Sequence, residues 1–173
     1  MSAATTEQNT AVLLEVALDL ANSLNNENRF DRLLTSIRKA IRCDAVALMG
    51  LHQQVLTPLA IQGLSTDTMG RRFSLSEHPR LALLCQSPGP YRFPADSELA
   101  DPYDGLLLAR SGDLPVHSCM GLPLYSDQQL IGLLTIDSLE PYAFDGISDK
   151  TLELMAALSA ATLKSAFEMT KLA

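Results

Sequence analysis

Apolar residues recur at intervals of three and four at both ends of the chain, which is the spacing of one face of an α-helix. Near the start this pattern predicts an amphipathic helix over Asn9–Asn25, ended by Asn26–Asn28, and a second helix from Phe30 to Ile41. At the other end it predicts a long helix over Ser148–Leu172, with Ser148 suited to cap the first turn. The chain therefore begins and ends with helices.

Short β-compatible runs fill the middle of the chain. Ala45–His52 and Val55–Gln62 are separated by two glutamines, and Cys119–Tyr125 is followed closely by Leu130–Asp137, so each pair predicts a hairpin. Between the hairpins, weaker patterns predict two short strands, a helix that Pro79 opens, and a loop with one helical turn. These weaker elements are expected at Arg71–Ser74, Tyr91–Phe93, His78–Gln86 and Ser97–Pro115, the helical turn lying near Asp104–Ala109.

Strands joined by short hairpins and flanked by long helices predict an α+β fold with a central antiparallel sheet of five or six strands. The N- and C-terminal helices are expected to pack together on one face, with Pro88–His117 over the other. Both terminal helices are rich in small and aliphatic residues, which favours a homodimer formed through them. In the alternative, they bury only their own face of the sheet.

Composition narrows the class of protein. The 173 residues suffice for one domain with its own core, and the net charge of −7 argues against direct contact with nucleic acid by this chain. The sequence has no secretory leader and no apolar run of the ~18 residues that a membrane helix needs. The three cysteines are far apart and suggest no disulfide framework. These features indicate a cytoplasmic protein with reduced thiols and no membrane contact.

Most of the plausible metal ligands lie between Tyr91 and Asp137. The stretch contains two aspartates three residues apart, then a histidine and a cysteine two apart, then an aspartate that closes the last predicted strand: Asp101, Asp104, His117, Cys119 and Asp137. Carboxylate, imidazole and thiolate together suit a transition metal. Each also has an ordinary structural alternative, as a turn residue that caps backbone amides or as a small core side chain.

The register of the last hairpin decides whether Asp137 shares a face with Cys119. A two-residue turn at Asp127–Gln128 would pair Asp137 with Ser118, on the wrong face. Longer turns of three residues would place it opposite Cys119 or His117. A shared site therefore requires an odd loop or a β-bulge.

Four segments carry a family resemblance: GRRFSLSEHPRL (Gly70–Leu81), RFPADSELADPYDGL (Arg92–Leu106), VHSCMGLPL (Val116–Leu124) and LIGLLTIDS (Leu130–Ser138). They resemble the N-terminal GAF domain of the NorR family, the sigma-54-dependent activators that respond to nitric oxide. The resemblance covers nearly the whole chain. It implies a regulatory domain, not an enzyme, that holds mononuclear non-haem iron (Fe²⁺). In this family nitric oxide binds the iron and relieves repression of an adjoining AAA+ ATPase, which activates transcription of detoxification genes.

The iron-site residues of that family match six positions here: Arg80, Asp101, Asp104, His117, Cys119 and Asp137. The resemblance assigns Asp101, Asp104, Cys119 and Asp137 as metal ligands. His117 and Arg80 are assigned to the cofactor site. Three aspartates and a thiolate carry more negative charge than Fe²⁺ compensates. We therefore interpret Arg80 as a residue that compensates charge and orients a carboxylate, in preference to a metal ligand.

The resemblance also implies that residues 1–173 form a single sensory domain excised from a longer activator, without its AAA+ and helix-turn-helix domains. Two other functions stay open. A GAF domain can bind an organic effector in the same cleft, or act as a free methionine sulfoxide reductase, for which Cys85 would have to lie near Cys119. A non-haem iron oxygenase is disfavoured because its triad of two histidines and a carboxylate has no matching motif.

Overall fold

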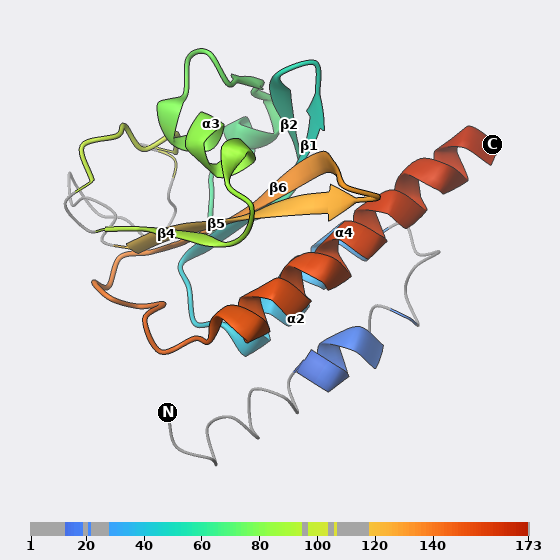
Figure 1. Cartoon of the computed structure of the whole chain (residues 1–173), viewed down its shortest axis with the longest axis horizontal. Coiled ribbons are helices and arrows are strands. Elements are labelled where there is room, and N and C mark those ends of the chain that lie inside the picture. Colours follow the sequence, from blue (N-terminus) through green and yellow to red (C-terminus); the bar gives the residue numbers. More distant parts are fainter. Residues whose placement is uncertain are drawn as a thin grey trace.

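Six strands form one antiparallel sheet in the computed structural model, which describes residues 13–18, 21, 28–94, 97–103, 106 and 118–172 (Figure 1). The strands lie in the order β3-β2-β1-β6-β5-β4. Their bounds are β1 Ala45–His52, β2 Val55–Gln62, β3 Phe73–Ser74, β4 Tyr91–Phe93, β5 Ser118–Ser126 and β6 Gln129–Ser138. The predicted antiparallel sheet of five or six strands is confirmed, and both hairpins are where the sequence places them.

Two helices cover one face of the sheet. They are α2, Arg29–Ala40, and α4, Asp149–Leu172, and Figure 1 shows them side by side beneath the strands. Residues 13–18 of the predicted first helix are also helical, and the rest of that helix lies outside the described residues. The side-chain oxygen of Ser148 accepts a hydrogen bond of 3.1 Å from the Thr151 amide, which confirms the predicted cap of α4.

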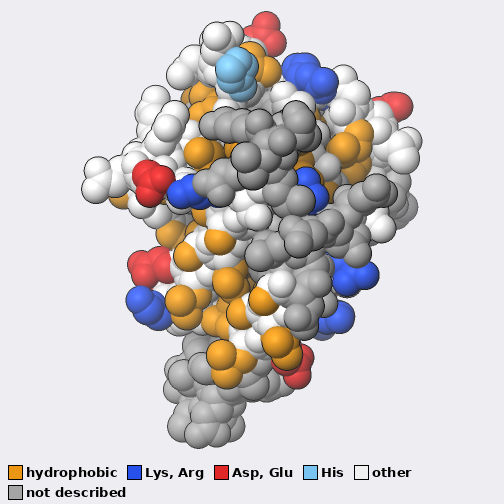
Figure 2. Space-filling model, turned by 90° about the vertical axis from the view of Figure 1, so that its right-hand side faces the viewer, with side chains coloured by type: hydrophobic (Ala, Val, Ile, Leu, Met, Phe, Trp, Pro, Cys, Tyr) orange, Lys and Arg blue, Asp and Glu red, His pale blue; other side chains and the backbone are white. Residues whose placement is uncertain are grey.

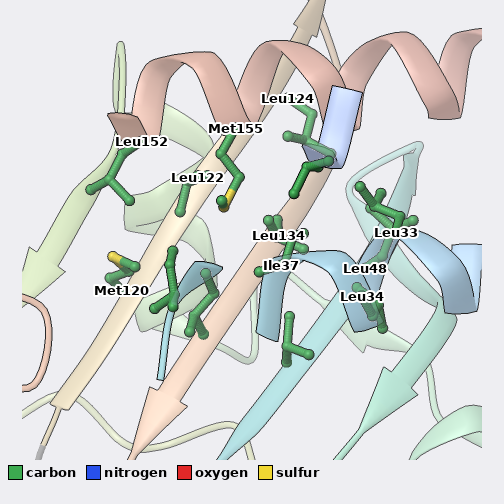
Figure 3. Close-up of a cluster of buried hydrophobic side chains, with 14 of the residues drawn as sticks. Leu33, Leu34, Ile37, Leu48, Met120, Leu122, Leu124, Leu134, Leu152 and Met155 are labelled. Carbon is green, nitrogen blue, oxygen red and sulfur yellow. The ribbon is translucent and has the colours of Figure 1, made fainter. Parts of the chain in front are cut away.

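The core on this face follows the period of two along the strands. Met120, Leu122 and Leu124 of β5 point toward the helices and are fully buried. Figure 3 shows these three residues meeting side chains from α2 and α4, with further contributions from β1 and β6. The residues that alternate with them along β5, such as Cys119 and Gly121, therefore face the opposite side of the sheet.

That opposite side carries a second core. It includes Leu81 and Leu84 of α3, Pro79–Gln86, and Pro79 lies in the first turn of α3 as predicted. A short 3₁₀ helix, Thr66–Gly70, follows β2. Leu99, Tyr103 and Leu106 of the segment expected over this face pack here, whereas Tyr91–Phe93 of the same segment is β4, an edge strand of the sheet. Phe73 packs edge-on against Tyr103, with ring centroids 5.8 Å apart.

Several apolar side chains of the terminal helices are exposed. Leu14, Leu18, Leu154 and Phe167 belong to the first helix and to α4. Figure 2 shows a face of the molecule on which apolar side chains gather in one area while acidic and basic side chains are scattered around it. Among the described residues, no helix is both long and apolar enough to span a lipid bilayer.

Candidate metal centre

Four strands place one residue each in a row across the second face of the sheet. Ala45 pairs with Asp137, Asp137 with Cys119, and Cys119 with Phe93. Residues directly opposite each other on neighbouring strands point to the same face. The side chains of Asp137 and Cys119 are therefore neighbours beneath α3.

A β-bulge sets this register. The hairpin turns through Asp127 and Gln128, both with positive φ, which alone would put Asp137 opposite Ser118. Between the pairs Tyr125–Leu130 and Leu124–Gly132, however, Ile131 is an extra residue on β6. The extra residue shifts the pairing by one, so Asp137 faces Cys119. The bulge is one of the two devices that the sequence required for a shared site.

Asp137 is a buried carboxylate, and the residue is 1% exposed. Neither carboxylate oxygen receives a hydrogen bond from a nitrogen or oxygen donor of the described residues, while the Cys119 thiol beside it acts as a hydrogen-bond donor. Burial and, as a smaller contribution, the negative charge of Asp101 raise the pKa of Asp137 to about 7. The Cys119 thiol and the positive charge of Arg80 oppose this rise in pKa. Such a carboxylate is unfavourable unless it holds a proton or a cation.

The Cys119 thiol is also buried, with 5% of the residue exposed. Burial raises its pKa well above the usual value, and the nearby Asp137 charge adds to the rise. At neutral pH the thiol therefore keeps its proton in the metal-free domain. A metal ion that binds here must displace that proton, because thiolate is the ligand form.

Arg80 reaches the same region from α3. Its Nη2 donates a hydrogen bond of 2.6 Å to the carbonyl of Leu99, and its guanidinium carbon lies 4.9 Å from the ring centroid of Phe93. Among the described residues Arg80 forms no ion pair with a carboxylate, and its expected role in orienting one stays a prediction, because Asp104 lies outside those residues. Its Nε is buried without a partner, and its charge lowers the pKa of both Asp137 and Cys119.

Asp101 lies in the loop above this row and is half-buried. Its Oδ1 accepts a hydrogen bond of 2.9 Å from the Tyr103 amide, the turn geometry that is the ordinary alternative for this residue. Its charge nevertheless acts on both Asp137 and Cys119. Tyr103 fixes the loop to the sheet, because its hydroxyl lies 2.7 Å from the hydroxyl of Thr135.

Asp104 and His117 lie outside the described residues. Within the described part of the chain, no three His, Cys, Asp or Glu side chains are already arranged around a common point for a metal ion. The structure thus brings Arg80, Cys119 and Asp137 together, with Asp101 close enough for its charge to act on them.

Two residues that support this region escaped the sequence analysis. Tyr103 stands between the two predicted ligand aspartates, and its anchoring role depends on a partner 32 positions away. Gly121 faces the same side as Cys119 and leaves room for Leu84 of α3. A Cβ at position 121 would lie 2.6 Å from Leu84 Cδ2 and 2.9 Å from its Cγ. In the sequence, the glycine two residues after Cys119 on the predicted strand could have indicated that another element approaches the sheet closely at this point.

A family model described as the GAF domain matches residues 25–162. The chain belongs to the GAF family.

Solved structures agree at the level of fold. The GAF domain of a phosphoenolpyruvate-protein phosphotransferase from Coxiella burnetii superposes with a TM-score of 0.71 at 21% identity, covering 92% of this chain and 96% of that one. A free methionine-R-sulfoxide reductase from Neisseria meningitidis gives a TM-score of 0.70 at 18% identity, covering 98% and 96%.

Curated relatives are much more similar in sequence. The regulatory protein LuxO of Vibrio cholerae is 57% identical over 162 residues, which cover 94% of this chain and 31% of that protein. The anaerobic nitric oxide reductase transcription regulator NorR of Serratia proteamaculans is 50% identical, covering 89% of this chain and 30% of the relative. The NorR of Escherichia coli is 46% identical, covering 93% and 32%.

The chain thus spans about a third of the length of these relatives. They are regulatory proteins, as the resemblance to NorR implied. The domain is a regulatory sensor module and not an enzyme. Its likeness to the sulfoxide reductase is one of fold alone.

Proposed function

We propose that this GAF domain senses nitric oxide through a mononuclear ferrous ion and controls an adjoining AAA+ ATPase in the cytoplasm. The proposed ligands are Asp101, Asp104, Cys119 and Asp137, with His117 and Arg80 completing the cofactor site. The similarity to NorR proteins, whose name refers to nitric oxide reductase, supports the choice of signal.

The observation that carries the proposal is the buried pair of Asp137 and Cys119. The Asp137 carboxylate, which receives no hydrogen bond from a nitrogen or oxygen donor of the described residues, faces the Cys119 thiol across β5 and β6, and both groups become anionic metal ligands once they lose their protons. Burying the charged form of either group without a compensating positive charge costs roughly several kcal/mol per ion. A bound cation removes this cost, and sulfur with oxygen donors suits a first-row transition metal. The residues present therefore fit an iron ion.

Each residue has a defined task in this site. Cys119 and Asp137 give up their protons and supply negative charge, and Arg80 compensates part of that charge from α3. Tyr103 holds the loop that carries Asp101 against the sheet. When bound, the ferrous ion supplies an open coordination position at which a diatomic gas binds. The buried surroundings restrict access of water to the donors.

Reconstitution with iron tests the ligand assignment. The purified domain, incubated anaerobically with ferrous ion and desalted, is expected to retain one iron per chain. Cys119→Ala and Asp137→Asn should each lose it while their circular dichroism stays that of the folded domain. Cys85→Ala is the matched control, because Cys85 is a half-buried thiol on α3 that is not part of the row of site residues. Full iron retention by both site variants would contradict the proposal.

The control of the ATPase is proposed to be repressive. In the absence of nitric oxide the domain inhibits the ATPase, so its deletion from the full-length regulator should leave the ATPase constitutively active. A homodimer through the terminal helices belongs to the same proposal. The exposed Leu14, Leu18, Leu154 and Phe167 on these helices support it.

A further inference from the structure

Every strand that carries a residue of the candidate site is also tied to one segment on the other side of the sheet. That segment, residues 139–148, joins β6 to α4 and is called the connector here. The ties come from residues directly next to Phe93, Cys119 and Asp137 in the chain. Because neighbouring residues of a strand point to opposite faces, one residue serves the site and the next serves the connector.

Arg92 is the strongest of these ties. It pairs with Met120, which points into the core beneath α4, whereas its neighbour Phe93 pairs with Cys119. The Arg92 guanidinium donates to the carbonyls of Phe144 at 3.3 Å and Ile147 at 2.6 Å. It also forms an ion pair of 2.8 Å with Asp149, the first residue of α4. One side chain of β4 thus holds the end of the connector and the start of α4.

Ser118 ties β5 to the beginning of the connector. Its hydroxyl donates to the carbonyl of Glu140 at 2.7 Å and accepts from the amide of Ala143 at 3.1 Å. Ser118 is buried and stands next to Cys119. A shift of the β5 backbone at Cys119 therefore moves the partner of two connector groups.

The third tie involves β6. Ser138, next to Asp137, accepts a hydrogen bond of 3.1 Å from the Glu140 amide. Asp44, whose amide donates to the Asp137 carbonyl at 2.9 Å, accepts from the Leu139 amide at 2.7 Å. The Asp137 carbonyl is thereby hydrogen-bonded to Asp44, and both Asp44 and the next residue, Ser138, hold the connector.

We propose that the connector is the output element of the candidate site and that Arg92 transmits a change at the Cys119–Asp137 pair to the first turn of α4. This inference rests on the proposed function, since it takes the iron site as the source of the change. The site with and without its signal must differ in the positions of β4, β5 or β6 for the connector to respond. Arg92 is a positioning residue in this scheme and touches no proposed ligand.

Amide hydrogen exchange of the whole 173-residue domain tests the proposal. The domain is compared anaerobically with ferrous ion alone and with ferrous ion plus nitric oxide, and electron paramagnetic resonance (EPR) spectra are recorded on the same samples. Exchange in residues 139–152 is expected to become at least threefold faster when nitric oxide is added. Arg92→Gln should give the same EPR signal, but exchange there should already be fast and should no longer respond.

Two further variants keep the test decisive. Arg72→Gln is the matched control, because Arg72 is exposed and its side chain donates to the carbonyl of Arg71, a residue far from the connector in sequence. It should respond like the wild type. Asp149→Asn removes the negative charge that pairs with Arg92, at an exposed position, so it should fold even if Arg92→Gln does not, and its response should be reduced.

The outcomes separate the two proposals. No EPR signal in the wild type would overturn the proposed function, and this inference with it. An EPR signal without a change in exchange at 139–152 would overturn only the role of the connector. A normal response of both Arg92→Gln and Asp149→Asn would overturn the role of Arg92.

Discussion

The ionisation of Asp137 links the candidate site to the stability of the domain. Its pKa is raised to about 7 in the folded state, chiefly by burial, from the ordinary value of 3.8 that applies to the unfolded chain. Between these two values the folded state binds more protons than the unfolded state does. Stability from this group is therefore fully present below pH 4 and is lost as the pH rises toward 7.

Asp137→Asn should remove this dependence in the metal-free domain. An amide cannot ionise, so the variant should gain stability relative to the wild type as the pH rises from 5 to 8. The relative gain should be on the order of 2 kcal/mol, because each pH unit between the two pKa values is worth about 1.4 kcal/mol. Urea unfolding in the presence of a chelator measures it. Parallel stability profiles for the two proteins would show that Asp137 is already ionised at pH 5 or is not buried as described.

At the level of secondary structure, the packing of α3 against β5 determines the position of Arg80. Leu84 occupies the space above Gly121, and Arg80 stands one helical turn earlier, over Phe93. The side chain of residue 121 therefore controls how closely the helix approaches the row of Cys119 and Asp137.

Gly121→Ala should destabilise the domain by about 1–3 kcal/mol, the usual cost of overpacking a core, and weaken iron binding by displacing α3. In the Leu84→Ala background the same substitution should cost much less, because the competing side chain is gone. Thermal or urea unfolding of the four proteins of this double-mutant cycle measures the coupling. Additive effects of the two substitutions would contradict the contact between Gly121 and Leu84 as the cause.

Local sequence patterns were enough to predict the helices and strands, but not the contacts between them. The period of the apolar residues placed both hairpins, and Pro79 and Ser148 marked helix starts correctly, because these signals are contained in a few adjacent residues. The bulge at Ile131 has no such signal, although the need for it followed from the two-residue turn. The three acceptors of Arg92 lie more than 50 positions away and depend on the folded sheet. The ligand set came from the resemblance, and the roles of Asp104 and His117 stay predictions.

In the molecule as a whole, the two faces of the sheet carry different features. One face holds the buried site under α3, and the other holds the helices α2 and α4, with the connector bonded to the strands between them. The regulatory proteins LuxO and NorR to which the chain is similar are about three times as long as this chain.

The central claim is that iron held by Asp137 and Cys119 binds nitric oxide. The most direct measurement is the EPR spectrum of the iron-loaded domain after anaerobic addition of nitric oxide, recorded beside Cys119→Ala, Asp137→Asn and the control Cys85→Ala. We expect a signal of a half-integer-spin iron–nitric oxide species in the wild type and in the control, with one spin per iron. We expect no such signal in the two site variants. Equal signals in all four proteins, or none in the wild type with iron bound, would contradict the claim.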